Sequence, residues 1–448
     1  MALVTPADWL PVLADRLDRR AERVTRLRSY VNGDAPLPEM GKNTRAAWIA
    51  FQQKARTNFG GIACSSHADR IRAQGVRVGS DDQSPLSLAA RRIWRDNRLA
   101  VQISDAVWDM ESASVGYLVV GLDEGRALVT AERPELFYAE PDPVRPWRSR
   151  AAIKVWRDDV EKVDHATVWA GGEKAWFTRP AFVGVSPLRV ASGGTWEPVR
   201  SEPFDGTLPV YILDRRDGLG LIEPHLDVIN RINLGKLQRL TTAAIQAFKQ
   251  RAVKGDLPEK DANGNPIDWA AVFEPSPGAL WDLPEGIGTW GSSTTDIRPM
   301  LDAEKQDARD FGAVTGTPIS MLLPDGANQT AESASNTTAQ QVMACRYDIE
   351  RLQPAVSAVM ATALQAEGFD LGDETVEVDF LDPERVTLAE QMDAFGKAVA
   401  AGVSLVTAQK SILQWTQDQI EEDGRNRQLE QAATDLGMLA GAITRQTA

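Results

Sequence analysis

The stretch from residue 221 to residue 251 constrains the fold of this chain more than any other. It reads LIEPHLDVINRINLGKLQRLTTAAIQAFKQR and is the longest uninterrupted helical pattern before residue 330. Apolar residues recur in it at steps of three and four, which predicts a helix with one apolar stripe. The stripe contains Leu226, Ile229, Leu237, Leu240, Ala244 and Phe248, and Ile232 or Asn233 fills the gap between the second and the third. Such a helix would extend about 45 Å, far longer than the usual helix of a globular domain, so its length requires a particular structural reason.

Composition predicts a folded protein that does not bind nucleic acid tightly. The chain has 448 residues, 43% of them hydrophobic, which is enough for two to four domains with sizeable cores. The net charge of −14 argues against strong, sequence-independent binding to nucleic acid, which depends on Lys and Arg, but leaves loose contact with DNA open. We expect an intracellular and soluble protein, because the sequence shows no N-terminal signal and no apolar run long enough to span a bilayer.

The sequence contains no recognisable catalytic or metal-binding motif. Cys64 and Cys345 are far apart and lack partners at metal-ligand spacing, so we expect two buried thiols and no disulfide. The three histidines, His67, His165 and His225, stand alone, and the phosphate-binding loop of ATPases is missing. We therefore predict a protein that is not an enzyme and that needs no cofactor and no metal.

Two features allow a different interpretation. Asp105, Asp109 and Glu111 share a helical neighbourhood and could form a cation site or a carboxylate pair, although in a chain with 63 acidic residues a solvated face is the better interpretation. The 13 tryptophans make a carbohydrate-active enzyme a distant alternative, because aromatic platforms with paired carboxylates suit glycoside chemistry. The scattered positions of the tryptophans argue against it.

The first 215 residues are predicted to be a helical opening followed by antiparallel β structure. Thr5 and Pro6 give a helix start for residues 5–31, whose arginines we interpret as a solvated face. Further helical stretches are expected near 43–73 and 85–97. The apolar run 115–122 predicts a buried strand. Shorter strands are expected at 127–131, 136–139, 151–157, 167–170, 174–178 and 208–213.

The segment that follows the long helix is acidic and carries four large aromatic residues between glycines and prolines. They are Trp269, Phe273, Trp281 and Trp290. The segment is too small to bury them well, so a small core of its own and an interface with a partner are both open.

The second half of the chain is predicted to be mainly helical. Residues 302–313 should form a short helix, and about 332–365 a second long one. Pro354 lies inside the latter and should kink it, because proline removes a backbone hydrogen bond and clashes with the preceding turn. Residues 376–380 predict a strand. Three C-terminal helices are expected at 387–401, 404–414 and 416–444.

The order of these elements resembles that of the portal proteins, or head-to-tail connectors, of tailed bacteriophages, specifically the siphophage type. The marks are weak singly and fairly specific in this order, over most of residues 45–402. They are Asn58 with Gly75-Val76, Trp94-x-x-Asn97-x-Leu99, Gly116-Tyr117-Leu118-Val119-Val120, Leu208-Pro209-Val210, Ile229-Asn230-Arg231, Thr315-Gly316-Thr317-Pro318, Glu332-Ser333-Ala334 and Val376-x-Val378-x-Phe380-x-Asp382-Pro383. The Trp-rich segment departs from the pattern, and residues 415–448 carry no recognisable signature.

The resemblance implies an α+β, mainly helical subunit that assembles into a ring, usually of twelve copies, with a central channel. It divides the chain into a wing at 1–215, stem helices at 216–250 and 300–314, a clip at 251–299, a tunnel loop at 315–330, a kinked wing helix and strand at 331–385, and a crown at 386–448. The implied function is the DNA conduit at one capsid vertex for genome packaging, retention and ejection. The implied location is the virion, with the host cytoplasm during assembly.

The resemblance also implies partners and candidate sites. Partners would be further copies of the chain, double-stranded DNA passing through without sequence recognition, the terminase large subunit, a head-completion adaptor, and the major capsid protein or scaffold, with no membrane. The four aromatic residues of the clip would form the partner interface. Candidate DNA-channel residues are Lys236, Arg239, Lys249, Met321, Leu322, Leu323, Asn328 and Gln329.

The acidic balance agrees with a conduit. A polyanion slides past a weakly repulsive wall, whereas each firmly held phosphate would add a barrier. The three cations of the long helix could equally pair with acids of an adjacent subunit. Another virion ring or adaptor protein remains an alternative, which predicts a different subunit number and no narrow channel.

Overall fold

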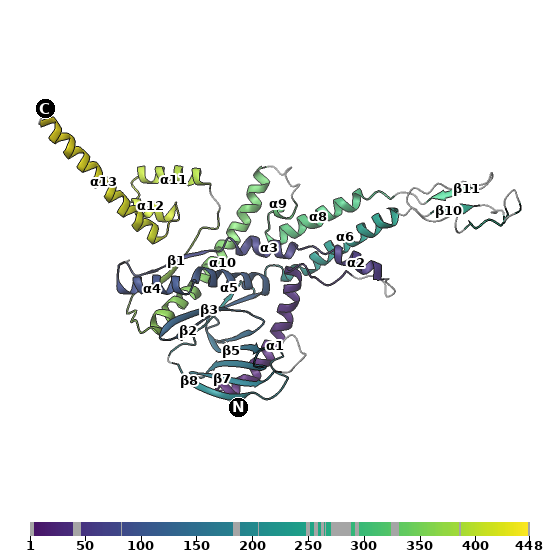
Figure 1. The fold of residues 1–448 in the computed structure, drawn as a ribbon, viewed down its shortest axis with the longest axis horizontal. Helices are drawn as coiled ribbons and strands as arrows, with labels where there is room; N and C mark the ends of the chain where they lie inside the picture. The colour runs from purple at the N-terminus through teal and green to yellow at the C-terminus, as the bar shows by residue number, and fades with distance from the viewer. Residues whose placement is uncertain are drawn as a thin grey trace.

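The computed structural model shows a body of helices and antiparallel sheets with two projections (Figure 1). One projection is a helical hairpin with a β tip, and the other is the C-terminal helix. The structure describes residues 4–38, 46–81, 83–181, 189–204, 206–247, 251–254, 259–260, 264, 266–269, 288–291, 295–323, 331–384 and 387–446. The predicted α+β, mainly helical class is confirmed.

The N-terminal helix α1 (Pro6–Val31) packs on a five-stranded antiparallel sheet. The sheet order is β4 (Phe137–Pro141), β5 (Ser149–Asp158), β6 (Val163–Ala170), β7 (Glu173–Pro180) and β8 (Glu197–Pro203). Thr5 caps α1 as predicted: its hydroxyl accepts from the Asp8 N–H, and the Asp8 carboxylate accepts from the Thr5 N–H. Strand β8 was not predicted, because all its side chains are exposed and no alternation marks it.

The sequence suggested that the arginines of α1 form a solvated face, but the structure shows this for only some of them. Three of them form ion pairs with other elements: Arg16 with Glu140, Arg23 with Glu223, and Arg28 with Asp109. Arg19 fits the prediction, because its side chain is 78% exposed and pairs along the helix with Asp15. The interpretation was wrong for the paired arginines because their partners lie more than 80 residues away in the chain.

A second core lies between two helices and a three-stranded sheet. The helices are α5 (Leu99–Ala113) and α10 (Ala331–Ala366), and the strands, in sheet order, are β3 (Arg126–Glu132), β2 (Val115–Asp123) and β9 (Val210–Asp214). At Gly116 of β2 a Cβ atom would lie 2.0 Å from the carbonyl oxygen of Ala106, so only glycine lets α5 approach the strand this closely. Helix α10 runs as one helix across the exposed Pro354. The kink there stays a prediction.

Residues 43–73 were wrongly predicted as one helical stretch. They contain α2 (Ala46–Lys54) and α3 (Phe59–Ala68), and β1 (Ala73–Val78) begins at the end of the range. Asn58 separates the helices, because its side-chain oxygen accepts from the Gly61 N–H and caps α3. Strand β1 pairs with β12 (Val376–Phe380), and α4 (Pro85–Asp96) packs on it.

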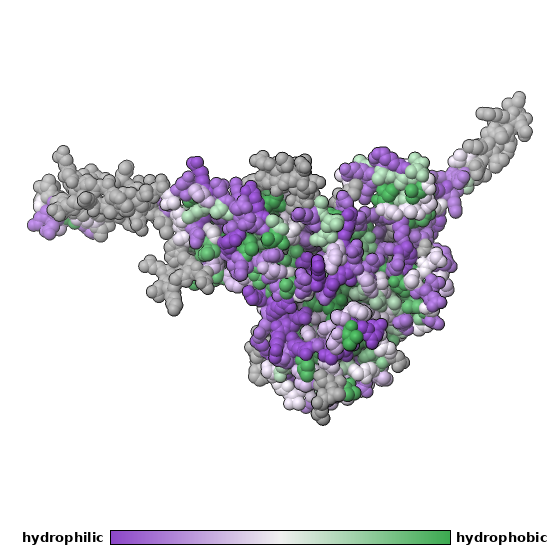
Figure 2. Space-filling model, turned by 180° about the vertical axis from the view of Figure 1, so that it is seen from behind, coloured by the Kyte–Doolittle hydropathy of each residue, from purple (hydrophilic) through white to green (hydrophobic). Residues whose placement is uncertain are grey.

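The three predicted C-terminal helices are present. They are α11 (Leu388–Ala400), α12 (Leu405–Ser411) and α13 (Gln417–Gln446). Two ion pairs attach these helices to the body: Lys410 of α12 pairs with Asp379, and Glu421 of α13 pairs with Arg91. Beyond this contact α13 leaves the body (Figure 1). Seen from behind, the surface is largely hydrophilic, with hydrophobic residues gathered near the base of the C-terminal helix (Figure 2). Among the helices that the structure describes, none has the length and apolarity needed to cross a bilayer.

Candidate functional site

The projecting hairpin contains the long helix that the sequence singled out, but this helix is shorter than predicted. The stretch 221–251 divides into a 3₁₀ turn, η1 (Glu223–His225), and α6 (Leu226–Ala247), and Arg251 already belongs to strand β10 (Arg251–Lys254). The 22 residues of α6 extend about 33 Å, and α1 with 26 residues is the longer helix. The pattern misled because Arg251 to Lys254 give their backbone groups to a strand pair instead of to the helix.

Helix α6 has one apolar side and one polar side. Of the predicted stripe, Leu226, Ile229 and Leu237 are buried, Leu240 and Ala244 are half-buried, and Phe248 lies outside the described residues. The exposed residues follow steps of four, three and four, and they are Asp227, Arg231, Leu234 and Gln238. The solvent side of α6 is therefore a mixed stripe with one acidic and one basic residue.

The hairpin partner of α6 is α8 (Arg298–Thr315), and ion pairs join the two helices. Arg231 contacts Asp307 at 2.9 Å and Asp310 at 3.1 Å, and Arg239 contacts Glu304 at 2.6 Å. The Arg239 pair is well shielded, because 26% of the arginine side chain and 13% of the glutamate side chain are exposed.

The cations predicted to face DNA are mostly used within the subunit. Lys236 Nζ lies 5.3 Å from the ring centre of Phe59, and burial lowers the pKa of Lys236. Arg239 has Glu304 as its partner, and Lys249 lies outside the described residues. A cation that already has an aromatic or acidic partner gains less from a passing phosphate.

Two other cations of the hairpin are free of ion pairs among the described residues and could contact DNA phosphates. Lys305 and Arg309 are exposed on α8, one turn apart, and neither has an ion pair among the residues that the structure describes. They share an exposed side of α8 with Asp302, Gln306 and Ala313. The sequence did not mark them, because the pattern of α8 gives no sign of which charges find acids on α6.

The described part of the predicted tunnel loop, residues 315–323, contains a short helix. Gly316 ends α8 with φ 67°, and residues Ile319–Leu322 form the short helix α9. Leu322, which was predicted as a channel residue, is 5% exposed and packs in the core that contains Phe311, so its side chain belongs to the body of the subunit. Met321 is 41% exposed, and Leu323 is half-buried.

The predicted loop residues Asn328 and Gln329 lie outside the described residues.

The far end of the hairpin is a small β tip. Strand β10 pairs antiparallel with β11 (Gly288–Gly291), which places Trp290 opposite Ala252. Trp269 is half-buried. Phe273 and Trp281, the other two aromatic residues predicted for an interface, lie outside the described residues.

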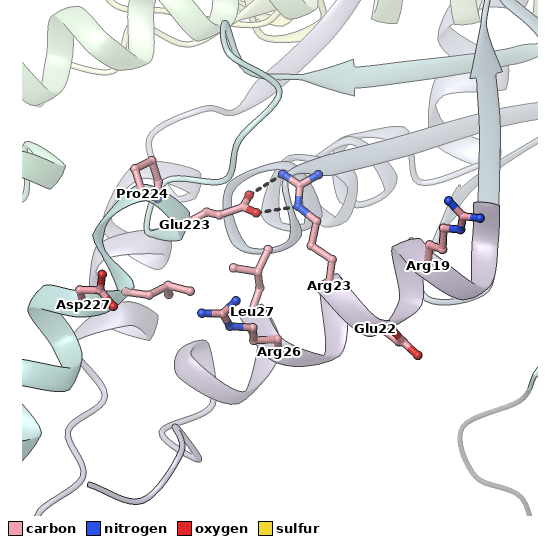
Figure 3. A pocket seen from close by; sticks show the side chains of 9 residues that line it. Arg19, Glu22, Arg23, Arg26, Leu27, Glu223, Pro224 and Asp227 are labelled. Carbon is pink, nitrogen blue, oxygen red and sulfur yellow. Dashed lines mark hydrogen bonds and ion pairs between the residues drawn. The ribbon is translucent and has the colours of Figure 1, made fainter. Parts of the chain in front are cut away.

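A cleft of about 500 Å³ lies where the hairpin joins the body (Figure 3). One wall is the C-terminal half of α1, with Arg19, Arg23 and Arg26, and the other is η1 and the start of α6. Arg23 forms a bidentate pair with Glu223, at 2.6 Å for both nitrogen–oxygen contacts. The Ser114 hydroxyl donates to the same carboxylate, also at 2.6 Å. These bonds lower the pKa of Glu223 against the opposing effect of burial and fix the base of the hairpin to α1.

A buried charge cluster lies in the body near the same junction. Nε of Arg215, just after β9, lies 3.5 Å from Glu111 Oε2 and 3.6 Å from Asp348 Oδ2. Glu111 is 0% exposed and Asp348 3%. Burial raises the pKa of both carboxyls, because a single guanidinium cannot neutralise two carboxylates in a dry site. The interpretation of Asp109 and Glu111 as a solvated face was therefore wrong, and only Asp105 is exposed.

The buried residues His67, Cys64 and Cys345 lie next to this cluster. The Cys64 thiol is 3.6 Å from the carbonyl oxygen of Glu111, and Cys345 Sγ is 3.9 Å from His67 Nδ1. Burial, together with the Arg215 charge, lowers the pKa of His67 to about 3, and burial raises the pKa of both thiols. All three are inert parts of the core, as the sequence predicted for the thiols. In the part of the chain that the structure describes, no three ligating side chains come together as a metal site.

The comparison with protein families gives one match across almost the whole chain. The model described as "Phage portal protein, SPP1 Gp6-like" matches residues 11–436. No curated protein sequence matches the chain closely enough to count as a relative.

Solved structures that are similar to this chain include a particle neck and a phage portal protein. One is the neck of a native GTA particle computed with C12 symmetry, at 14% identity over 86% of this chain and 98% of that chain, with a TM-score of 0.46. Another is an HK97 family phage portal protein from Corynebacterium diphtheriae, at 12% identity over 78% of this chain and 97% of that chain, with a TM-score of 0.34. Because both TM-scores are below 0.5, the family of this chain rests on the sequence match over residues 11–436.

Proposed function

Because the chain belongs to the phage portal protein family of the SPP1 Gp6-like type, we propose that twelve copies form the ring that conducts DNA through one capsid vertex. Double-stranded DNA would enter through this ring during packaging, be retained by it, and leave through it during ejection. Portal proteins are structural components of the phage particle, so the chain is not an enzyme and the carbohydrate-active alternative is wrong. Its site of action is the virion, and it passes through the host cytoplasm during assembly.

The observation that carries this proposal is the α6–α8 hairpin. It leaves the body as two paired helices and ends in a small β tip (Figure 1). A lone hairpin of this length gains little by projecting into water, whereas a ring of hairpins encloses a channel and gives their sides neighbours.

We assign the segments of the chain accordingly. The stem comprises residues 216–250 and 300–314, the clip 251–299 and the tunnel loop 315–330. The wing comprises 1–215 with 331–385, and the crown 386–448. The clip, which carries Trp269 and Trp290, is the docking site for the terminase large subunit and later for the head-completion adaptor. The major capsid protein or the scaffold contacts the body.

We place the DNA contacts of the stem on α8. Lys305 and Arg309 are exposed and lack acidic partners among the described residues, whereas Lys236 and Arg239 are engaged inside the hairpin. Two cations per subunit, in a chain with a net charge of −14, give a sparse set of phosphate contacts. Such contacts guide DNA without holding it, because affinity rises with every phosphate that is neutralised.

Electron microscopy and native mass measurement of the purified protein test the ring. A closed ring with a central channel supports the proposal, and a monomer, a dimer or an open filament contradicts it.

The DNA contacts are tested in an assembly reaction with the double variant Lys305→Ala/Arg309→Ala. We expect intact rings and a several-fold change in the rate or yield of packaging. The matched control is Lys397→Ala/Arg427→Ala, which removes two exposed cations of the C-terminal helices, 76% and 51% exposed. Equal packaging by both double variants would contradict the assignment of α8 to the channel.

We retain Met321 as the tunnel-loop contact, because its side chain is 41% exposed while Leu322 is part of the core. Met321→Ser should leave ring assembly intact and lower the fraction of particles that retain DNA. Leu322→Ser, in contrast, should lower the stability of the subunit itself. Normal DNA retention by Met321→Ser would contradict the proposal that Met321 contacts DNA in the channel.

A further inference from the structure

Helix α11 carries an apolar side that the described part of the subunit leaves largely exposed. Leu388, Met392, Phe395 and Val399 follow each other at steps of four, three and four, which places them on one side of the helix. Leu388 is 71% exposed, Met392 53% and Val399 37%. Phe395 is half-buried, and no residue of α11 is fully buried.

Nearby residues extend this apolar side into a patch. Val403 and Val406, in the turn and helix that follow, are 41% and 53% exposed. We call these five exposed residues, Leu388, Met392, Val399, Val403 and Val406, the α11 patch. Figure 2 shows hydrophobic residues gathered near the base of the C-terminal helix. A contiguous exposed patch of this kind marks an interaction surface.

Within the subunit, α11 has little to pack on. Its principal neighbour is α12, and the polar residues on the opposite side of α11, Asp393 and Lys397, pair with each other in solvent. Most of the stability of a helix in a protein comes from packing of its apolar side, so a partner that covers this side would stabilise α11.

Helix α13 also has apolar residues that are exposed to solvent. Its first turns are anchored by Ile420, which is 7% exposed, and by the Gln409–Asp423 hydrogen bond. From Arg425 to Thr434, however, every residue is exposed, including Leu429 at 69%. In sequence, Leu429 begins a series with Ala432, Leu436, Leu439 and Ile443 at steps of three and four. This is the spacing of helices that pack side by side.

We propose that the α11 patch of one copy is covered by α13 of the neighbouring copy in the ring, with Leu429 as an anchor. This inference rests on the proposed function, and it names a contact between neighbouring copies that would close the ring. Helix α13 points away from its own body (Figure 1), so its apolar series meets the patch of another copy. A surface on one copy that fits a different surface on the next is a head-to-tail contact, which closes into a ring when the rotation per copy fits.

Disulfide trapping tests the contact in assembled protein. A chain with both Met392→Cys and Leu429→Cys should give covalent multimers up to the closed ring under mild oxidation. The native thiols do not interfere, because Cys64 and Cys345 are buried. Co-assembly of Met392→Cys chains with Leu429→Cys chains should give only cross-linked dimers.

The matched control moves one cysteine to the other side of α11. Lys397→Cys with Leu429→Cys should give at least ten-fold less cross-linking, because Lys397 lies on the polar side and is 76% exposed. A cross-link within one chain would show that α13 folds back on its own α11 and would overturn the proposal. Equal cross-linking at positions 392 and 397 would also overturn it.

A second measurement separates failure of this contact from failure of the ring. The alkylation rate of Met392→Cys should fall at least ten-fold on going from free subunits to rings. Rings in which this thiol stays fully accessible would leave the proposed function standing and refute the contact. If the wild-type chain forms no ring at all, both the proposed function and this inference fail.

Discussion

The bidentate pair at the base of the hairpin gives a quantitative test of what holds the hairpin to the body. The Glu223 carboxylate accepts two bonds from Arg23, one from the Ser114 hydroxyl and one from the Gly220 N–H. Only 18% of the Glu223 side chain and 35% of the Arg23 side chain are exposed. Hydrogen bonds to charged groups contribute about 1.5–3 kcal/mol each when buried, and partial exposure of the arginine reduces this.

We therefore expect Glu223→Ala to lower the free energy of unfolding by about 2–3 kcal/mol, since it leaves a half-buried guanidinium and a hydroxyl without their acceptor. Glu223→Gln keeps the shape and one acceptor and should cost about half as much. The control is Asp15→Ala, which breaks the Arg19–Asp15 pair on the same α1 helix. Those side chains are 78% and 52% exposed, so the loss should be about 0.5 kcal/mol or less.

Urea unfolding of unassembled subunits, at one protein concentration for all variants, measures these differences. Hydrogen exchange over residues 218–230 shows whether the loss is local to the hairpin base. If Glu223→Ala is no less stable than Asp15→Ala, the reasoning is wrong and the hairpin is held by its apolar contacts alone.

Three further predictions follow from other parts of the molecule. Gly116→Ala should destabilise the subunit by about 3 kcal/mol or more, because the new methyl would clash with the Ala106 carbonyl. The control is Gly121→Ala on the same strand, where the nearest neighbouring atom is 4.0 Å from the new methyl. Similar melting temperatures of the two variants would contradict the close approach of α5 to β2. The folded-state pKa of Glu111 is raised by burial, so the unfolded chain releases this proton first and stability falls as pH rises above about 4.3. Glu111→Gln should flatten that fall between pH 5 and pH 9 in thermal melts, and an unchanged slope would assign it to other groups. Pro354→Ala should stabilise α10 by about 1–3 kcal/mol, because it restores a backbone donor inside the helix; a loss of stability would mean that the native helix is shaped around the proline.

Several elements could be predicted from the sequence because their signals are local. The cap at Thr5, the apolar spacing of α1 and of α10, and the apolar run of β2 each lie within one element and need no distant partner. Strand β8 was missed for the opposite reason. All its side chains are exposed, so no alternation of buried and exposed residues marks it in the sequence.

The sequence by itself determined the order of most elements, the apolar sides of the helices and the family, because periodicity, caps and turns are written within a few residues of each other. Only the tertiary structure decided what each charge does. Lys236 and Arg239 were predicted to meet DNA, yet their partners, Phe59 and Glu304, come from elsewhere in the chain. Glu111 was predicted to be solvated, yet it is enclosed with Arg215, which follows it by about a hundred residues. Charge pairing and desolvation depend on which surfaces the fold brings together, and spacing along the chain carries no record of that.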